Sequence, residues 1–261
     1  MNVNRLHEGL RTRRFGKNIV FLREVSSTND LAKELAGYGA VEGTVVVAES
    51  QTAGRGRLDR EWFSPKGGLW FSVVLRPKLK PTEAVKLVFA SGLAVAEVLH
   101  ELYGLKAETK WPNDVLVNKR KVCGVLTEIN TTGSRVNYVV VGAGLNANFD
   151  VATVFPEELR KVAVSLENVL NRKVRLEELF GAVLEKFEYF YELLLKEGFD
   201  PLLARWKRYA GFLGSQVEVV SGAEKWVGLA VNVDYDGSLI LRLKDGTEKR
   251  VFVGDVTLLL R

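Results

Sequence analysis

Cysteine, methionine and histidine are almost absent from this 261-residue chain, which contains one Cys, one Met and two His. The single cysteine, Cys123, cannot form an intramolecular disulfide or a cysteine-based zinc cluster. His7 and His100 lie far apart in the sequence, so they do not suggest a metal site or an acid–base pair. We therefore expect no metal centre built from these residue types.

Long apolar runs are also missing. The longest uncharged stretches, such as residues 136–149, are shorter than the roughly 20 apolar residues that span a bilayer. The basic N-terminus has no apolar signal-peptide core behind it. Hydrophobic residues nevertheless make up 47% of the chain, enough for a sizeable core. We expect a cytoplasmic protein without a membrane partner.

Charge of one sign is concentrated in a single place. The formal net charge is +5, and residues 1–23 hold six basic residues against one acidic residue, so the remainder is neutral overall. A nucleic-acid-binding surface would be distributed along the folded domain. A basic terminal segment is more often a solvated face or arm, and we expect no DNA partner.

Hydrophobic periodicity predicts an α+β fold. Strands are expected at 19–23, 44–48, 69–75, 114–117, 121–129 and 136–142. Residues 26–30 (S-S-T-N-D) supply N-cap chemistry for a short helix. Long helices are expected at 82–103, with an amphipathic pattern, and at 176–196, with Gly198 as its stop. Without regular βαβ alternation, a mixed sheet with flanking helices is favoured over a doubly wound fold.

The last 50 residues have a different pattern. Short strands are predicted at 216–220, 225–233, 238–243, 248–253 and 256–260, and the two Asp-Gly pairs at 236–237 and 245–246 are hairpin signals. Five short strands in so few residues favour a small β-barrel. We expect a main domain over residues 1–211 and the barrel over 212–261.

Four segments carry chemistry, beginning with Q-T-A-G-R-G-R-L-D-R-E-W at 51–62. Glycines let a backbone approach a ligand, and arginines bind phosphate or carboxylate. The alternatives are a mobile basic loop or an arginine–glycine RNA-binding segment, of which there is a single copy. The segment is not a Walker loop, because no G-K-[ST] follows.

The other three segments are K-W-P-N-D at 110–114, K-R-K-V-C-G-V-L-T-E at 119–128 and G-A-G-L-N at 142–146. The first could simply be a turn before a strand, and the second could be a charged strand edge. The third resembles the start of a dinucleotide fingerprint. The later glycine, the helix and the ribose-binding acid are missing, so that interpretation fails.

In this order, the segments resemble the biotin protein ligases, in a monofunctional form without an N-terminal DNA-binding domain. S-T-N at 27–29 and G-G-L-W-F-S at 67–72 complete the dense match over about 20–150, and Gly254-Asp255-Val256 matches loosely. The resemblance implies a catalytic domain of the class II aminoacyl-tRNA-synthetase/biotin-ligase type and an SH3-like C-terminal barrel. It also implies formation of biotinoyl-5′-AMP from biotin and ATP with Mg²⁺, then transfer of biotin to a lysine of a biotin carboxyl carrier protein domain, and a homodimer.

The resemblance also implies a set of site residues. Arg57 and Lys121 are expected at the biotin carboxylate and α-phosphate, with Arg55 near the same centre. Asp114 is expected to orient or deprotonate the acceptor lysine, or else only to hold Lys110 and the turn. The implied biotin and nucleotide contacts are Ser27, Thr28, Asn29, Gln51, Gly54, Arg55, Gly56, Arg57, Arg60, Trp62, Lys110, Asn113, Lys121, Gly124, Gly144 and Asn146.

Single roles within this set have competing interpretations. Ser27 could bind the biotin ureido group or cap a helix, and the two roles compete for one hydroxyl. Trp62 is expected to flank the adenine together with Arg60, but it could be a core residue. Asn146 is expected at the adenine edge, but it could only form a turn. Residues 150–210 are expected to be scaffold.

Two alternative functions come from related or different classes. A lipoate or octanoyl transferase has a similar fold, but that family favours R-R-x-S-G-G-G where this chain has only P-K-G-G at 65–68. A DNA-binding regulator needs a helix-turn-helix domain. Residues 1–26 are expected to contain one strand rather than three packed helices.

Overall fold

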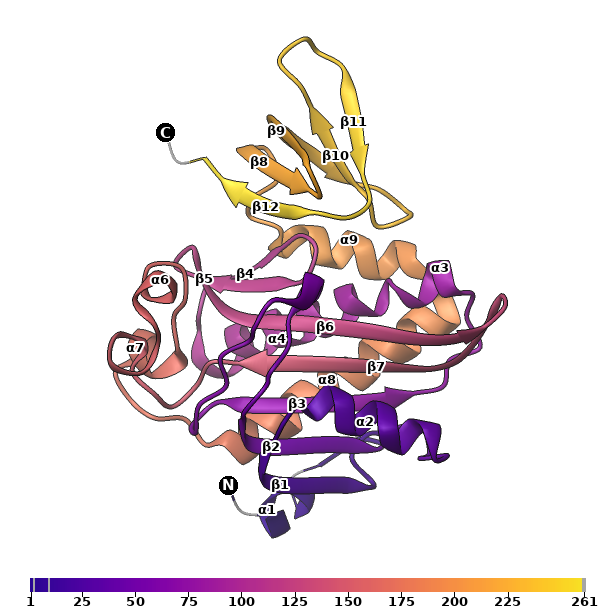
Figure 1. Ribbon diagram of the computed structural model, residues 1–261, viewed down its shortest axis with the longest axis vertical. Coiled ribbons are helices and arrows are strands. Elements are labelled where there is room, and N and C mark those ends of the chain that lie inside the picture. The colour runs from indigo at the N-terminus through magenta and orange to yellow at the C-terminus, as the bar shows by residue number, and fades with distance from the viewer. Residues whose placement is uncertain (2, 9, 260–261) are drawn as a thin grey trace.

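The computed structural model describes residues 1, 3–8 and 10–259, and within them the chain folds around two β-sheets (Figure 1). The larger sheet has the order β1-β2-β3-β7-β6-β5-β4, with β1 and β2 parallel and the other neighbours antiparallel. Its strands are β1 (Ile19–Val25), β2 (Val45–Gln51), β3 (Leu69–Leu75), β4 (Ala107–Lys110), β5 (Asp114–Val117), β6 (Arg120–Thr132) and β7 (Arg135–Leu145). The predicted mixed sheet is confirmed, and β4 was missed.

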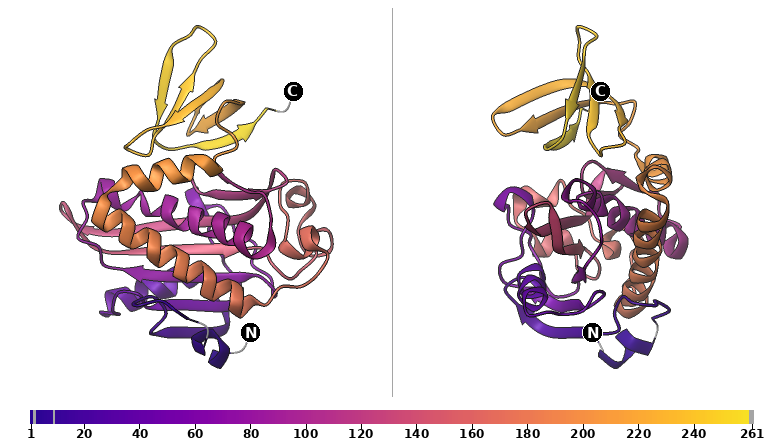
Figure 2. Two further views of the ribbon diagram at one scale, coloured as in Figure 1. Left: turned by 180° about the vertical axis from the view of Figure 1, so that it is seen from behind. Right: turned by 90° about the vertical axis from the view of Figure 1, so that its right-hand side faces the viewer.

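Helices cover both faces of this sheet. One face carries α2 (Thr28–Gly37), and the other carries α4 (Leu87–Tyr103) and α8 (Leu176–Glu197), which the view from behind shows (Figure 2). Strand β2 contributes side chains to the core on both faces of the sheet, because successive side chains of a strand point to opposite faces. Val45 and Val47 belong to the main core, whereas Val46 packs with Ala32 and Ala36 of α2.

The predicted helix over 82–103 is wrong in two respects. It is divided into α3 (Pro81–Ala84) and α4, and α4 is buried around most of its circumference from Leu87 to Leu99. The sheet and α8 lie on different sides of α4, so it has little exposed face. The predicted helix at 176–196 is confirmed as α8, which ends at Gly198.

Several short elements carry too few residues for periodicity to reveal them. They are α1 (Val3–Glu8), the 3₁₀ turn η1 (Arg57–Asp59), α5 (Val151–Val154), α6 (Glu157–Arg160) and α7 (Leu166–Leu170). The longer α9 (Phe199–Tyr209) was also missed. Residues 1–26 therefore contain a short helix as well as the expected strand. In the part of the chain described, no helix is long and apolar enough to cross a membrane.

The basic N-terminal segment is packed onto the protein rather than forming a free arm. The carboxylate of Glu188 on α8 accepts hydrogen bonds from the backbone N–H groups of Arg13, Arg14 and Phe15 at 2.6 to 2.8 Å. Phe15 is fully buried, while the side chains of the basic residues are exposed. The expectation of a solvated basic face is confirmed, and the alternative of an arm is wrong.

The smaller sheet is wholly antiparallel, with the order β11-β10-β9-β8-β12. Its strands are β8 (Gln216–Ser221), β9 (Glu224–Val233), β10 (Leu239–Arg242), β11 (Glu248–Val251) and β12 (Asp255–Leu258). The five predicted strands are confirmed, although the predicted end of the last one, Leu260, lies outside the described residues. The sheet is consistent with the predicted SH3-like unit, called the barrel below. The domain boundary at 211/212 stays a prediction.

The barrel contacts the β4–β5 end of the larger sheet through its backbone (Figure 1). Lys110 Nζ donates to the carbonyl of Val256 at 3.0 Å, and Trp111 Nε1 donates to that of Gly237 at 2.9 Å. Arg57 Nη1 donates to the carbonyl of Gly254 at 3.2 Å. Residues of two predicted motifs therefore hold the barrel in place.

Candidate active site

A cavity of about 360 Å³ lies where α2, β2, β6 and β7 meet the barrel. This is a usual volume for a small-molecule site. Every predicted site residue lines it except Gly54. A side chain at Gly54 would meet the carbonyl oxygen of Trp62 at 2.4 Å, so this glycine permits a close backbone approach within the 51–64 segment.

One end of the cavity is neutral and polar. Gln51 Oε1 accepts from the Thr28 backbone N–H at 2.8 Å and lies 3.1 Å from the Thr28 hydroxyl. The Ser72 hydroxyl lies 2.6 Å from Asn29 Oδ1. Ser27 caps α2 through a long contact of 3.4 Å from the Asp30 N–H. A cap only uses the hydroxyl oxygen as an acceptor, so the Ser27 proton stays available to a ligand.

The other end is built around Asp114, whose side chain is 13% exposed. Lys121 Nζ lies 2.7 Å from one carboxylate oxygen and Lys110 Nζ lies 3.3 Å from the other. Burial acts to raise the pKa of Asp114, but the charges and hydrogen bonds of Lys121 and Lys110 outweigh it, so the pKa lies below its usual value. Asp114 is therefore ionised at neutral pH.

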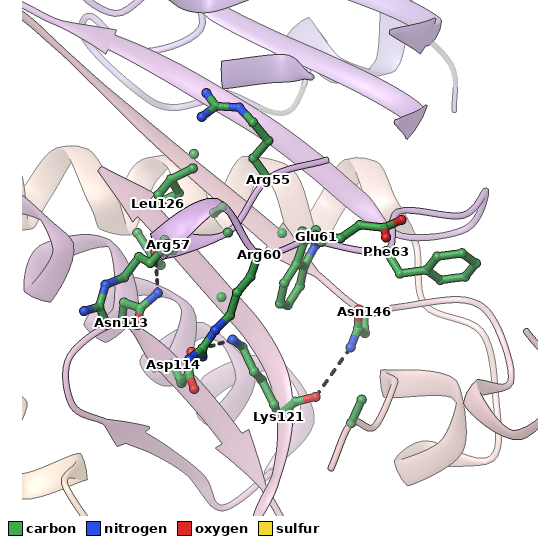
Figure 3. A pocket seen from close by; sticks show the side chains of 18 of the residues that line it. Arg55, Arg57, Arg60, Glu61, Phe63, Asn113, Asp114, Lys121, Leu126 and Asn146 are labelled. Atoms are coloured by element: carbon green, nitrogen blue, oxygen red, sulfur yellow. Dashed lines mark hydrogen bonds and ion pairs between the residues drawn. The ribbon is translucent and has the colours of Figure 1, made fainter. Parts of the chain in front are cut away.

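Arg57 enters this centre from η1 (Figure 3). Its Nη1 donates to Asn113 Oδ1 at 3.2 Å and lies 3.7 Å from Asp255. Burial lowers the pKa of Arg57, and the carboxylates of Asp255 and Asp114 act against that shift. Arg60 forms a 2.5 Å ion pair with Asp255. The segment that carries both arginines is thus tied to the barrel.

Arg55 was expected near the same centre as Arg57 and Lys121. It lines the cavity but does not lie with these two residues. Its guanidinium points away from the Asp114–Lys121 pair (Figure 3) and binds Asp30 at 2.6 Å and Glu128 at 3.0 Å. Burial acts to raise the pKa of Glu128, but Lys33, Asn29 and Arg55 together hold it below its usual value. Arg55 thereby connects the 51–62 segment to α2 and β6.

Two facing glycines form part of the cavity wall beneath Trp62. Gly124 of β6 and Gly144 of β7 are register partners. A Cβ atom at Gly144 would lie 2.3 Å from Trp62 Nε1, and one at Gly124 would lie 2.9 Å from the same indole. Lys121 Nζ lies 4.8 Å from the centre of the Trp62 ring, at cation–π distance. Larger residues at either position would displace the tryptophan.

Two buried polar atoms at this end have no hydrogen-bond partner among the described residues: Trp62 Nε1 and Asn146 Oδ1. The amide nitrogen of Asn146 donates to the Val164 carbonyl at 3.2 Å, which leaves its oxygen free. Buried polar groups are usually paired. A free donor and a free acceptor in one cavity therefore suit a polar ligand that completes both.

The sequence interpretation missed two parts of the wall, residues 155–163 and the barrel residues 255–257. Residues 162–164 run beside the start of β6, where the Lys121 N–H donates to the Val162 carbonyl at 2.7 Å. The expectation that 150–210 is only scaffold is therefore wrong. The missed lining residues are Glu61, Phe63, Phe71, Val125, Leu126, Gly142, Ala143, Phe155, Leu159, Val162, Ala163, Asp255, Val256 and Thr257.

A metal centre built from side chains is not evident. Among the described residues, no three His, Cys, Asp or Glu side chains gather as a metal-binding group. The carboxylates of Asp114 and Asp255 at the cavity are both paired with cationic side chains. Any metal that acts here would have to take most of its ligands from a bound substrate and water.

Comparisons with known proteins agree with this geometry. Residues 21–146 match the biotin/lipoate A/B protein ligase family, and residues 212–259 match the biotin protein ligase C-terminal domain. The bifunctional ligase/repressor BirA of Bacillus subtilis is 34% identical over 259 residues, which cover 99% of this chain and 79% of that protein. A biotin–[acetyl-CoA-carboxylase] ligase of Paracoccus denitrificans is 35% identical, covering 85% of this chain and 92% of the relative.

Solved structures show the same similarity. The biotin protein ligase of Aquifex aeolicus in complex with biotin and ATP superposes with a TM-score of 0.79 at 31% identity, covering 93% of this chain and 98% of that one. The Leishmania major biotin protein ligase in complex with biotinyl-5-AMP gives a TM-score of 0.57 at 26% identity, covering 91% and 99%. The ordered motifs, the shared fold and the two matched regions lead to one conclusion: the chain belongs to the biotin protein ligase family.

Proposed function

We propose that this protein is an ATP-dependent biotin ligase that forms biotinoyl-5′-AMP and transfers biotin to a lysine of a biotin carboxyl carrier protein domain. The single observation that carries the proposal is the cavity itself, which joins a neutral polar end to a cationic end. Biotin has the same division, with a neutral ureido ring at one end and a carboxylate at the other. The similarity to ligases solved with biotin, ATP and the adenylate supports the same assignment.

In the first half-reaction, a biotin carboxylate oxygen attacks the α-phosphorus of ATP. A new P–O bond forms, and the bond to the β-phosphate oxygen breaks, releasing pyrophosphate. The reacting groups are both anionic, so positive charge must stand where they meet. Lys121 and Arg57 lie at that end of the cavity, and we assign both to this task. Arg55 is instead a positioning residue for the 51–62 segment.

Biotin is assigned to the polar end. The hydroxyls of Ser27 and Thr28 and the amide of Gln51 offer donors and acceptors to a ureido group, while Asn29 and Ser72 hold one another at 2.6 Å behind them. We assign the thiophane ring and valeryl chain to the part of the wall near Gly124, next to the Trp62 indole and the Lys121 stem. Gly56 lines the cavity and leaves room for the ligand beside the 51–62 segment, whereas Gly54 lets that segment pack closely against Trp62.

The nucleotide is assigned to the end that carries the two unpaired polar atoms. Trp62 and Arg60 would flank the adenine, and Asn146 Oδ1 would accept from its amino group. Phe155, Leu159 and Ala163 add an apolar wall. A wall that excludes water protects the adenylate, which is a mixed anhydride and hydrolyses readily.

In the second half-reaction, the acceptor amine attacks the biotinoyl carbonyl carbon. A C–N bond forms, the C–O bond to the phosphate breaks, AMP leaves, and the proton lost by the nitrogen passes to the departing phosphate or to water. Lysine is mostly protonated at neutral pH. The lowered pKa of Asp114 keeps it ionised and makes it a weak base, so we assign it to orienting the incoming lysine rather than to removing its proton.

Mg²⁺ is assigned to the triphosphate. It keeps several waters and binds through phosphates and one or two carboxylates in such sites. When bound, the ion supplies positive charge to the leaving pyrophosphate. The carboxylates that line the cavity are those of Glu61, Asp114 and Asp255.

The finer assignments concern partners and location. We propose a homodimer, because β5 pairs with β6 only from Arg120 to Gly124 and no described strand pairs with that side of β6 beyond it. We propose no DNA partner, because the charge excess lies within residues 1–23 and the rest of the chain is neutral overall rather than basic along one face. The single buried thiol of Cys123 suits the reducing cytoplasm.

The defining experiment supplies purified protein with ATP, Mg²⁺, biotin and a competent carrier domain. We expect pyrophosphate release and one biotin on one lysine of the carrier. Absence of incorporation would refute the proposal. A thermal-shift comparison separates the lipoate alternative, because a ligand stabilises only the protein that binds it; we expect a shift with biotin and none with lipoate.

A further inference from the structure

Four exposed apolar side chains belong to segments that meet at the entrance of the cavity. Leu58, Val162, Phe252 and Val253 are 62%, 57%, 64% and 53% exposed. They come from η1, from the segment after α6 and from the turn between β11 and β12. None of the four packs into a hydrophobic cluster of the described residues. We call this set the apolar rim.

Backbone contacts place the apolar rim beside the reacting centre. Leu58 directly follows Arg57, and Val162 accepts a hydrogen bond from the Lys121 N–H at 2.7 Å. Val253 precedes Gly254, whose carbonyl accepts from Arg57 at 3.2 Å. Three separate segments therefore carry exposed apolar side chains close to Lys121 or Arg57. Each of these side chains belongs to a residue that contacts Lys121 or lies next in sequence, or nearly so, to Arg57 or to its partner Gly254.

Packing within the chain gives no reason for these side chains. Leu58 adopts φ +54°, a left-handed conformation that is uncommon for a residue with a side chain. A leucine held in that conformation and left 62% exposed gains no burial from its own fold. Exposed apolar side chains on several segments that border one polar cavity are typical of an interaction site. The neighbouring charges, Arg60 and Asp255, already neutralise each other at 2.5 Å.

The proposed reaction determines what must approach this entrance. A lysine has a four-carbon stem, so its ε-amine can reach Lys121 and Asp114 only if its own backbone lies at the mouth of the cavity. The residues on either side of that lysine must then contact the rim. We propose that the apolar rim is the docking surface for the carrier domain and receives apolar side chains that flank the acceptor lysine. This inference rests on the proposed ligase function.

The first test separates docking from chemistry. The variant Phe252→Ser/Val253→Ser is compared with wild type in biotin-dependent ATP–pyrophosphate exchange, in transfer to the carrier domain and in transfer to hydroxylamine. Tyr38→Ser, an 84% exposed residue at the far end of α2, is the control. We expect the KM for the carrier to rise about tenfold, with the exchange rate, hydroxylamine transfer and the control variant within about twofold of wild type.

An unchanged KM for the carrier would overturn the proposal. An equal fall in exchange and in both transfers would also overturn it, because the rim would then seal the cavity instead of binding a partner. A shift in oligomeric state at unchanged carrier KM would assign the rim to a second copy. If wild type itself shows no biotin-dependent exchange, the ligase function fails, which is a distinguishable result.

A double-mutant cycle tests the identity of the contact. The two residues that flank the acceptor lysine in the carrier are changed to serine and tested against wild type, Leu58→Ser and the Phe252→Ser/Val253→Ser variant. We expect the carrier change to raise KM with wild type and to add little with the rim variants, since coupled residues are not additive. Fully additive effects would contradict direct contact.

Discussion

A single carboxylate, Asp114, organises the cationic end of the active site. Lys121 and Lys110 contact its two oxygens, so the position of each ammonium depends on the same group. The carboxylate and the two ammonium groups are strongly coupled, because removal of one charge leaves the others incompletely compensated. Substitutions of these residues are therefore expected to change the electrostatics of the site more than its packing.

Replacement of Lys121 by Met should abolish most adenylate formation. The variant keeps the stem of the side chain and loses the charge at the reacting centre, so we expect a fall of about 10²–10³ in the rate of biotin-dependent pyrophosphate exchange. Lys121→Arg, which retains the charge, should lose less. A Lys121→Met variant with a near wild-type exchange rate would remove Lys121 from the proposed mechanism.

Asp114 should make stability depend on acid pH. Its pKa in the folded protein lies below the usual value of 3.8, so its stabilising contribution is fully present above that value and is lost as the pH falls through the lowered pKa. We expect Asp114→Asn to cost about 1–3 kcal/mol at neutral pH. The difference from wild type should shrink on acidification. Urea unfolding at a series of pH values measures this; a difference that grows toward low pH would contradict the assignment.

Gly142→Ala tests the polar end without changing any charge. A Cβ atom there would lie 2.0 Å from Asn29 Oδ1, the atom that the Ser72 hydroxyl contacts. We expect displacement of Asn29, a loss of about 1–3 kcal/mol of stability and weaker biotin binding by calorimetry. Gly92→Ala on α4, where nothing lies within 4 Å of the new atom, is the matched control. Equal biotin affinity in both variants would show that Asn29 is not needed.

Single residues also show how far the sequence could predict the site. The six motifs identified the polar and charged residues of the cavity between 27 and 146, because glycine, arginine and asparagine in those patterns have no role in filling a core, but they did not identify its wall at 155–163 or its barrel residues at 255–257. The direction of Arg55 could not be predicted. It depends on Asp30 and Glu128, which lie 25 and 73 residues away in the chain. Both belong to quoted segments, at 26–30 and 119–128, but neither segment indicates that its acid pairs with Arg55.

At the scale of elements, the wall formed by residues 150–164 was missed for a physical reason. It consists of two one-turn helices and a stretch of extended chain, which are too short for a 3.6-residue period. Its packing is nevertheless specific: the Phe155 ring lies 5.2 Å from Phe63 and 5.3 Å from Phe149, in a cluster separate from the main core. Such a satellite cluster can open without unfolding the sheet.

Phe155→Ala should therefore loosen this wall selectively. We expect faster amide hydrogen exchange over 150–164 and a raised KM for ATP, while exchange in α8 and affinity for biotin stay near wild type. Leu195→Ala on α8, an exposed apolar residue, serves as the control. A uniform rise in exchange across the larger sheet would mean that the segment belongs to the main cooperative unit instead.

At the scale of the whole molecule, the two sheets meet through contacts that also belong to the active site. The α+β class, the large mixed sheet and the five C-terminal strands followed from periodicity and turn chemistry. The position of the barrel against the larger sheet could not be predicted in this way. Backbone carbonyls of the barrel accept the hydrogen bonds from Arg57, Lys110 and Trp111, and a carbonyl acceptor is not visible in the sequence pattern.

Trp111→Phe tests this seating. The indole is 1% exposed and its Nε1 donates to the Gly237 carbonyl, so phenylalanine keeps most of the apolar volume and leaves that oxygen unpaired. We expect a loss of about 1–3 kcal/mol and faster proteolysis between 210 and 216, where α9 gives way to β8. Trp226→Phe on the barrel, which donates no such bond to the larger sheet, is the control. Equal protease resistance of all three proteins would disprove the seating role.

The reliance on main-chain oxygens has a consequence for sequence divergence. A carbonyl is supplied by any amino acid, so the barrel can change most of its side chains and still present the acceptors that Arg57, Lys110 and Trp111 require. The constraint falls almost entirely on the donors. The short, strict motifs are then expected among the donors in the first 150 residues, whereas the barrel, although it matches its own family model over residues 212–259, shows only a loose motif at Gly254-Asp255-Val256.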